Sequence, residues 1–140
     1  MAKPKIESAL ATAQVFEGLS KRHLRQLVKV GTVSNRASGV AIVMQGQPGG
    51  AFFVILTGQA KVEVNGRTVN RALPGDFFGE ISLLDGGPRS ASVIAETPVT
   101  LFTLSRRAFV KAIEQEPSIS IGIMRSMARS IRRADRSLAH

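Results

Sequence analysis

The chain has 140 residues, of which 44% are hydrophobic, and it carries a formal net charge of +9 and no cysteine. This length suits one domain with a single sizeable core, and the lack of cysteine excludes disulfides, thiolate metal sites and cysteine nucleophiles. The two histidines, His23 and His140, are far apart, so no histidine cluster is expected, and His23 is predicted to be a solvated helix residue. No apolar run reaches the length of a membrane span and no secretion signal is present, so we expect a cytoplasmic protein without a transmembrane segment.

Helical spacing of apolar residues characterises the start of the chain. Residues 5–13 and Lys21–Val30 both show it, and a turn-like segment at residues 16–19 separates them. Ser20 stands where it would cap the second helix. Residues 1–31 are therefore predicted to form a helical lead.

From residue 32 to residue 104 the pattern changes to short β-rich runs punctuated by glycine. The runs include VAIVMQ, AFFVILTG, AKVEV and SVIAE. Asn65 and Gly66 lie between two runs and predict a type I′ hairpin, because that turn needs positive φ at both residues. Residues 32–104 are predicted to form an antiparallel β-roll, jelly-roll-like, with about eight strands.

Two helices are predicted to follow the roll, within residues 105–140. Ser105 can cap a helix over residues 106–114, and Pro117 suits the first turn of a last helix that reaches about Leu138. The predicted fold class is thus α+β in a single domain of residues 1–140: N-terminal helices, a β-roll and C-terminal helices.

An apolar row in the last helix steps by three and four residues, as do the a and d positions of a coiled coil. Its members are Met124, Met127, Ile131, Ala134 and Leu138. Two alternatives follow: the row packs on the roll of its own chain, or it pairs with a second copy in a homodimer.

The same helix is strongly basic, with one acid, Asp135, against five arginines: Arg125, Arg129, Arg132, Arg133 and Arg136. A solvated face explains such a pattern. The alternatives are steering of an anionic nucleotide, contact with an acidic partner, or loose binding to nucleic acid or anionic lipid, none of them sequence-specific.

The segment over residues 75–93, GDFFGEISLLDGGPRSASV, carries the most specific chemistry. Gly79 and Glu80 open a run long enough for only one or two helical turns, whose free amides form an anion site. Arg89 would add two parallel hydrogen bonds to a phosphate, and Ser90 a hydroxyl and an amide. Glu80 would repel phosphate, so its carboxylate suits neutral donors such as ribose hydroxyls. The alternative is that Glu80 and Arg89 simply pair with each other in a surface loop.

FGEISLL followed by PRSAS resembles the phosphate-binding cassette of cyclic-nucleotide-binding domains, a family that includes the sensor halves of catabolite-activator-type proteins and of cyclic-nucleotide-gated channels. The resemblance covers the whole order of helices, roll and helices. It implies that Glu80 binds the ribose 2′-hydroxyl, that Arg89 binds the cyclic phosphate, and that backbone amides complete the cradle. The implied ligand-binding set is Gly79, Glu80, Ile81, Ser82, Arg89, Ser90 and Ala91.

The resemblance also bears on the purine and on the last helix. In the activators, the helix positions that reach adenine fall on Ala134 and Asp135, which become candidate base or lid contacts. Asp135 could accept from adenine N6 and would repel guanine O6, whereas Ser90 offers a hydroxyl where several cGMP-preferring members have threonine. We therefore expect cAMP as the ligand, with cGMP as the alternative. The helix-turn-helix of the activators is not expected here, nor is sequence-specific DNA binding.

Three classes of function follow from the sequence. The first is a non-enzymatic sensor in which a cyclic nucleotide repositions the last helix and signals to a downstream protein that the sequence does not identify. The second is an enzyme such as a phosphodiesterase, but no metal cluster or nucleophile-base pair is visible, so no catalytic residue, metal or cofactor is expected. The third is a basic scaffold for anionic partners. The chain would also suit a regulatory fragment of a larger channel, transcription factor or enzyme.

Overall fold

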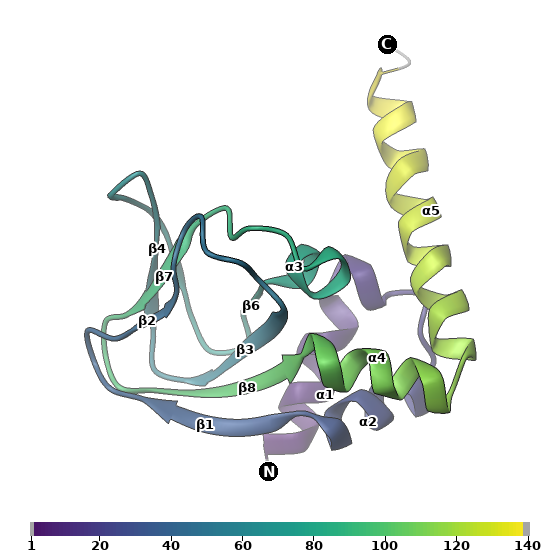
Figure 1. Ribbon diagram of the computed structural model, residues 1–140, viewed down its shortest axis with the longest axis horizontal. Coiled ribbons are helices and arrows are strands. Elements are labelled where there is room, and N and C mark those ends of the chain that lie inside the picture. The colour runs from purple at the N-terminus through teal and green to yellow at the C-terminus, as the bar shows by residue number, and fades with distance from the viewer. Residues whose placement is uncertain (1, 139–140) are drawn as a thin grey trace.

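The structure is a computed structural model that describes residues 2–138, in which helices precede and follow two four-stranded sheets (Figure 1). The N-terminal lead consists of α1 (Ala2–Thr12), the 3-10 helix η1 (Gln14–Phe16) and α2 (Lys21–Val30). The strands are β1 (Thr32–Arg36), β2 (Ala41–Val43), β3 (Ala51–Thr57), β4 (Ala60–Val64), β5 (Arg67–Ala72), β6 (Phe77–Phe78), β7 (Ser92–Ala95) and β8 (Val99–Ser105). Helix α3 (Glu80–Asp85) lies between β6 and β7, and α4 (Arg106–Gln115) and α5 (Ser118–Leu138) follow β8. The predicted α+β class, with its roll of about eight strands, is confirmed.

All strand pairings in the two sheets are antiparallel. One sheet has the order β1-β8-β3-β6 and the other β2-β7-β4-β5. Strand β3 is buried on both faces, since Phe53 and Ile55 point into the roll while Phe52 and Val54 point toward the helices. This alternation explains why its sequence, AFFVILT, is a continuous apolar run.

The hairpin turn and the two helix caps that the sequence predicts are present in the structure. Asn65 and Gly66 have φ angles of 52° and 80°, as the type I′ hairpin between β4 and β5 requires. The Ser20 side chain accepts from the His23 amide at the start of α2, and the Ser105 side chain accepts from the Ala108 amide at the start of α4. Both caps satisfy backbone donors that a helix start leaves free.

The helices share a second core that covers the outer face of β3 and β8. The rings of Phe16 and Phe52 meet edge to face, with centroids 5.2 Å apart, and Phe109 lies 6.3 Å from Phe16. Leu10 and Ile119 are completely buried in the same cluster. Segments from both ends of the chain therefore pack together against the roll, on the side where Figure 1 shows the helices gathered.

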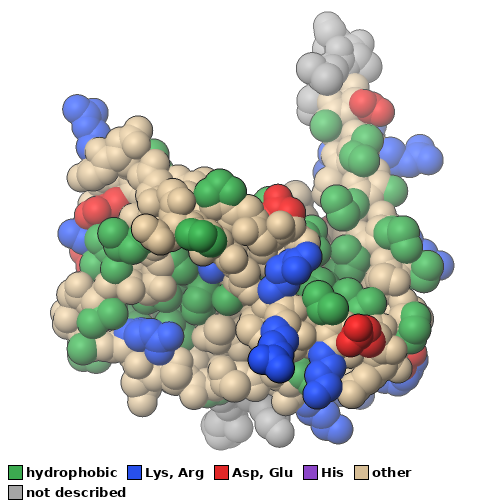
Figure 2. All heavy atoms as spheres, viewed as in Figure 1, with side chains coloured by type: hydrophobic (Ala, Val, Ile, Leu, Met, Phe, Trp, Pro, Cys, Tyr) green, Lys and Arg blue, Asp and Glu red, His purple; other side chains and the backbone are tan. Residues whose placement is uncertain are grey.

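Helix α5 contacts the body of the protein from Ile119 to Arg133 but leaves most of its apolar row exposed. Ile119 and Ile123 are buried, whereas Met124, Met127 and Ile131 are 56%, 47% and 62% exposed. The C-terminal part projects away from the roll (Figure 1), and Figure 2 shows hydrophobic side chains along it. The alternative in which this apolar row packs on its own roll is therefore not what the structure shows. The side chain of Leu138 lies outside the described residues.

His23 corrects a second expectation. It was predicted to be solvated, but only 9% of it is exposed, and its Nε2 lies 2.9 Å from the Ser118 hydroxyl. The sequence placed it correctly on a helix, but its hydrogen-bond partner comes from the start of α5, 95 residues away. Periodicity within α2 carries no information on such a distant partner.

Candidate functional site

The segment predicted to bind phosphate forms a compact turn that begins with α3. Gly79, at φ 89°, precedes the helix, and Gly86, at φ 68°, ends it with its amide bonded to the Ser82 carbonyl at 2.7 Å. Beyond the helix, the Asp85 carboxylate accepts from the Gly87 amide at 2.7 Å. The Ser82 hydroxyl donates to the Gly87 carbonyl at 3.3 Å. These bonds hold the short helix and the following corner together, and we call residues 79–89 the α3 unit.

This unit borders a cavity of about 470 Å³. All seven residues of the predicted ligand-binding set line it, namely Gly79, Glu80, Ile81, Ser82, Arg89, Ser90 and Ala91. The opposite wall is apolar and comes from four strands, with Val43, Val62, Phe78 and Val93. These wall residues were not among the predicted ligand contacts, although the period-two alternation of β4 and β7 could have assigned Val62 and Val93 to an inner face. The cavity thus has a polar side beside α3 and an apolar side formed by the strands.

Arg89 is held at the cavity by the scaffold. Its Nη1 donates to the Ala51 carbonyl at 3.0 Å, and its guanidinium lies 5.7 Å from the centre of the Phe53 ring. Partial burial lowers the pKa of Arg89, but an arginine starts so high that it stays charged at neutral pH. The donors of the guanidinium that do not face Ala51 are available to an anion.

Glu80 is half-buried and only partly satisfied. Burial raises the pKa of its carboxyl, and a hydrogen bond from the Val15 backbone amide lowers it by less. Its Oε2 is buried and has no hydrogen-bond partner in the described structure. Glu80 and Arg89 are not partners in any ion pair of the described residues, so the surface-pair alternative is not what the structure shows. An unpaired buried acceptor is costly, and a ligand hydroxyl would relieve that cost.

The raised pKa of Glu80 gives a pH-dependent prediction for the free protein. A carboxyl whose folded-state pKa lies above its ordinary value of 4.5 costs no stability below that value, and the cost grows as the pH rises through the folded-state pKa. Glu80→Gln removes the ionisation, so the variant should melt above the wild type at about pH 7 and level with it at about pH 4. Glu114→Gln, at an exposed site on α4, is the control. An equal gain at both pH values would contradict the prediction.

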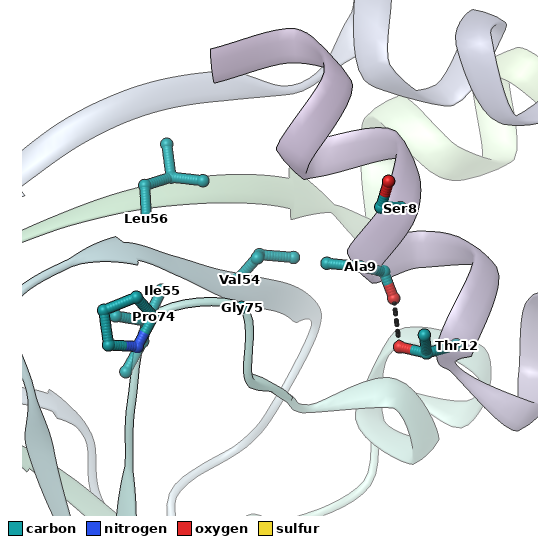
Figure 3. A pocket seen from close by; sticks show the side chains of 8 residues that line it. All are labelled: Ser8, Ala9, Thr12, Val54, Ile55, Leu56, Pro74 and Gly75. Atoms are coloured by element: carbon teal, nitrogen blue, oxygen red, sulfur yellow. Dashed lines mark hydrogen bonds between the residues drawn. The ribbon is translucent and has the colours of Figure 1, made fainter. Parts of the chain in front are cut away.

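A second hollow of about 470 Å³ lies between α1, β3 and the turn after β5 (Figure 3). Apolar side chains dominate it, and Figure 3 shows Val54 and Ala9 facing it from opposite sides. Its polar side chains are Ser8 and Thr12, and the Thr12 hydroxyl already donates to the Ala9 carbonyl at 2.7 Å. No charged side chain lines it. Of these two hollows of equal volume, only the one beside α3 offers partners for an anionic ligand.

The two candidate base contacts lie elsewhere. Ala134 and Asp135 are exposed on the projecting part of α5 and do not line the cavity. Any contact between them and a nucleotide requires α5 to move or a second copy to supply them. Within residues 2–138, none of the helices combines the length and apolar character of a membrane span. The same residues hold no group of three or more histidine, aspartate or glutamate side chains placed to bind a metal.

The roll, the short helix at its mouth and the acid and arginine beside one cavity define a ligand-binding regulatory domain. The chain belongs to the cyclic nucleotide-binding domain family, whose model matches residues 35–116. That family is a regulatory, non-catalytic module.

Relatives of several kinds are similar to this chain. A CRP-like cAMP-activated global transcriptional regulator of Mycobacterium tuberculosis is 30% identical over 139 residues, which cover 96% of this chain and 62% of that protein. The cGMP-dependent protein kinase egl-4 of Caenorhabditis elegans is 38% identical over 111 residues, covering 74% of this chain and 14% of the kinase. The N-terminal domain of a transcriptional regulator from Streptomyces coelicolor A3(2) superposes with a TM-score of 0.80 at 26% identity, covering 90% of this chain and 94% of that one. The chain thus spans less than two thirds of the length of these two curated relatives.

Proposed function

We propose that this chain is a non-enzymatic sensor that binds a cyclic nucleotide monophosphate, with a preference for cAMP, in the cavity beside α3. The observation that carries the proposal is the pairing, in one cavity, of an unsatisfied Glu80 oxygen with the charged Arg89 guanidinium. A cyclic nucleotide would present a ribose hydroxyl to Glu80 and a singly charged phosphate to Arg89. The apolar wall of Val62 and Val93 then receives the flat purine.

Two observations support cAMP over cGMP. The similarity to the cAMP-activated regulator extends over 96% of this chain, against 74% for the cGMP-dependent kinase. Asp135 accepts hydrogen bonds, so it matches the N6 amino group of adenine and repels the O6 of guanine. Because Asp135 is exposed in the structure, this second argument applies to a state in which α5 reaches the nucleotide.

Signal output is proposed to come from α5. Its exposed apolar row, Met124, Met127 and Ile131, is a surface that gains stability when covered. Closure over the cavity and pairing with a second copy both cover it. A ligand that binds one placement of α5 more tightly shifts the population toward that placement, and the downstream protein reads the change.

A thermal melt with cyclic and linear nucleotides tests the ligand. We expect saturating cAMP to raise the melting temperature and AMP to leave it nearly unchanged. At a hundredfold excess of cAMP over Kd, the free energy of unfolding should rise by about 2.7 kcal/mol. The linear phosphate carries a second charge, which the single arginine at the corner does not neutralise. Since the chain has no Trp or Tyr, the melt needs calorimetry or a dye.

Two controls complete this experiment. Cyclic nucleotide recovered after incubation should be intact, since we propose no catalysis. Light scattering with and without cAMP distinguishes pairing of α5, which doubles the mass, from closure, which leaves it unchanged. A melt that ignores cAMP and cGMP alike would refute the proposal, and an equal or larger shift with cGMP would refute the preference.

A further inference from the structure

The side chain of Gln45, in the connection that follows β2, bonds to the tip of the β4–β5 hairpin. Its Oε1 accepts from the Asn65 amide at 2.8 Å, and its Nε2 donates to Asn65 Oδ1 at 3.1 Å. The Gln45 backbone amide donates to the Ser92 hydroxyl at 2.8 Å. One residue therefore ties its own segment to two others, which lie 20 and 47 residues away in the sequence. We call these three hydrogen bonds the Gln45 bridge.

The Gln45 bridge lies at one end of three neighbouring strands. In the second sheet, β7 lies between β2 and β4 and pairs with both. Ser92 begins β7, Gln45 comes two residues after the end of β2, and Asn65 is the first residue after β4. The bridge therefore adds a direct link between the ends of β2 and β4, across the start of the strand that separates them.

The same three strands supply the apolar wall of the cavity beside α3. Val93 of β7 pairs with Val43 of β2 on one side and with Val62 of β4 on the other, and all three line the cavity. We call these three residues the valine row. Gln45 lies two residues beyond Val43, and Asn65 lies three beyond Val62. A change in the separation of the two strand ends therefore changes the spacing of the valine row.

The residues that follow Gln45 hold the backbone at Arg89. The Gly46 amide donates to the Arg89 carbonyl at 2.8 Å, and the Arg89 amide donates to the Gln47 carbonyl at 2.9 Å. Arg89 is thus fixed through its backbone as well as through the bond from its side chain to the Ala51 carbonyl. Because Gln45 directly precedes this pair of bonds, it connects the apolar wall of the cavity to the segment that carries the arginine.

We propose that Gln45 is a positioning residue of the nucleotide site: its side-chain amide sets the spacing of the valine row and joins that row to the backbone that carries Arg89. The inference rests on the proposed function and identifies a residue that governs which base the site accepts. A purine covers more of an apolar wall than a pyrimidine does, so it gains more from a row held at a fixed spacing. Gln45 therefore favours purine over pyrimidine cyclic nucleotides, although it does not line the cavity itself.

The experiment measures affinity for cAMP and for the pyrimidine nucleotide cCMP by calorimetry, in the wild type, in Gln45→Ala and in Gln59→Ala. Gln59 is a matched control because its side chain also bonds a distant residue, donating to the Glu96 carboxylate at 3.1 Å, and because it does not line the cavity. We expect Gln45→Ala to bind cAMP roughly two- to fivefold more weakly, the effect of losing one or two exposed hydrogen bonds. Its affinity for cCMP should change less, so the two Kd values should approach each other. Gln59→Ala should keep both wild-type affinities.

Asn65→Gly tests the same contact from the side of the hairpin. Glycine adopts the φ of this position, 52°, without strain. It keeps the backbone amide that donates to Gln45 and loses the Oδ1 that accepts from it. We expect a smaller loss of cAMP affinity than in Gln45→Ala. The double variant should bind no more weakly than Gln45→Ala alone, because the two substitutions remove the same contact.

A purely structural role for Gln45 would lower the melting temperature and leave the ratio of the cAMP and cCMP Kd values unchanged, and that result would overturn the proposal. Additive losses of cAMP affinity in the double variant would overturn it too. Should Gln45→Ala fail to fold, Asn65→Gly decides by the same ratio. Wild-type binding of cAMP with an unaltered ratio in both variants would overturn this inference alone, whereas no binding of either nucleotide would overturn the proposed function.

Discussion

Arg89→Ala is expected to weaken cAMP binding by about 2 to 5 kcal/mol, roughly a 30- to 5,000-fold rise in Kd. Arg89 is the charged donor among the residues lining the cavity, and a phosphate left there without it is desolvated and unpaired. The side chain also donates to the Ala51 carbonyl at 3.0 Å, so its loss removes one tie between the α3 unit and β3. Calorimetry with cAMP measures the effect directly.

Two further variants separate charge from geometry at this position. Arg89→Lys keeps the charge but loses the planar fork, so we expect it to recover only part of the lost affinity. Arg107→Ala removes an arginine that is exposed on α4 and does not line the cavity, and it should bind cAMP as the wild type does. Equal losses at Arg89 and Arg107 would show that net charge, rather than a specific contact, governs binding.

Elements with a local chemical signal were predictable from the sequence. The Asn65-Gly66 turn and the Ser105 cap were predicted correctly because each depends on residues within three positions of one another. The alternating burial of β3 could be read only coarsely, since an apolar run shows that a strand is buried and not which residue faces which core. Long-range packing was the part that the sequence did not reveal, as His23 and its partner Ser118 demonstrate.

In the candidate site, too, local features were predictable from the sequence and long-range contacts were not. Gly79, Glu80 and Arg89 lie within eleven residues of one another, and their residue types alone indicate an anion and hydroxyl site, which the structure assembles around one cavity. The contact that holds Arg89 comes from a distant segment, the Ala51 carbonyl of β3. It uses a backbone group, which every residue possesses, so no residue type marks it in the sequence.

The contacts that Glu80 and Arg89 make in the structure bear on ligand affinity. Arg89 bonds the Ala51 carbonyl and keeps further guanidinium donors, whereas the buried Oε2 of Glu80 has no partner in the described structure. A side chain that is held in place before a ligand binds loses less conformational entropy on binding, which favours affinity.

Gly79→Ala is the second variant for which we expect a large effect. At φ 89° an alanine is strained by about 1 to 2 kcal/mol. A Cβ there would also lie 2.7 Å from Arg89 Nη1 and collide with the Ala51 carbonyl oxygen, the two groups that bond to each other across this point. The α3 unit must therefore move away from β3, which displaces Arg89 and the first amides of α3 together. We expect cAMP affinity to fall by at least roughly tenfold, as loss of a charged hydrogen bond alone would cause.

Gly75→Ala is the control that separates strain from collision. Gly75 has nearly the same φ, 93°, but a Cβ there meets no atom within 4 Å. Both variants should lose stability in a thermal melt, Gly79→Ala more than Gly75→Ala, and only Gly79→Ala should lose affinity for cAMP in calorimetry. Equal affinities in the two variants would mean that the α3 unit tolerates a side chain between Ala51 and Arg89, and that the arrangement of Arg89 on the Ala51 carbonyl does not determine binding.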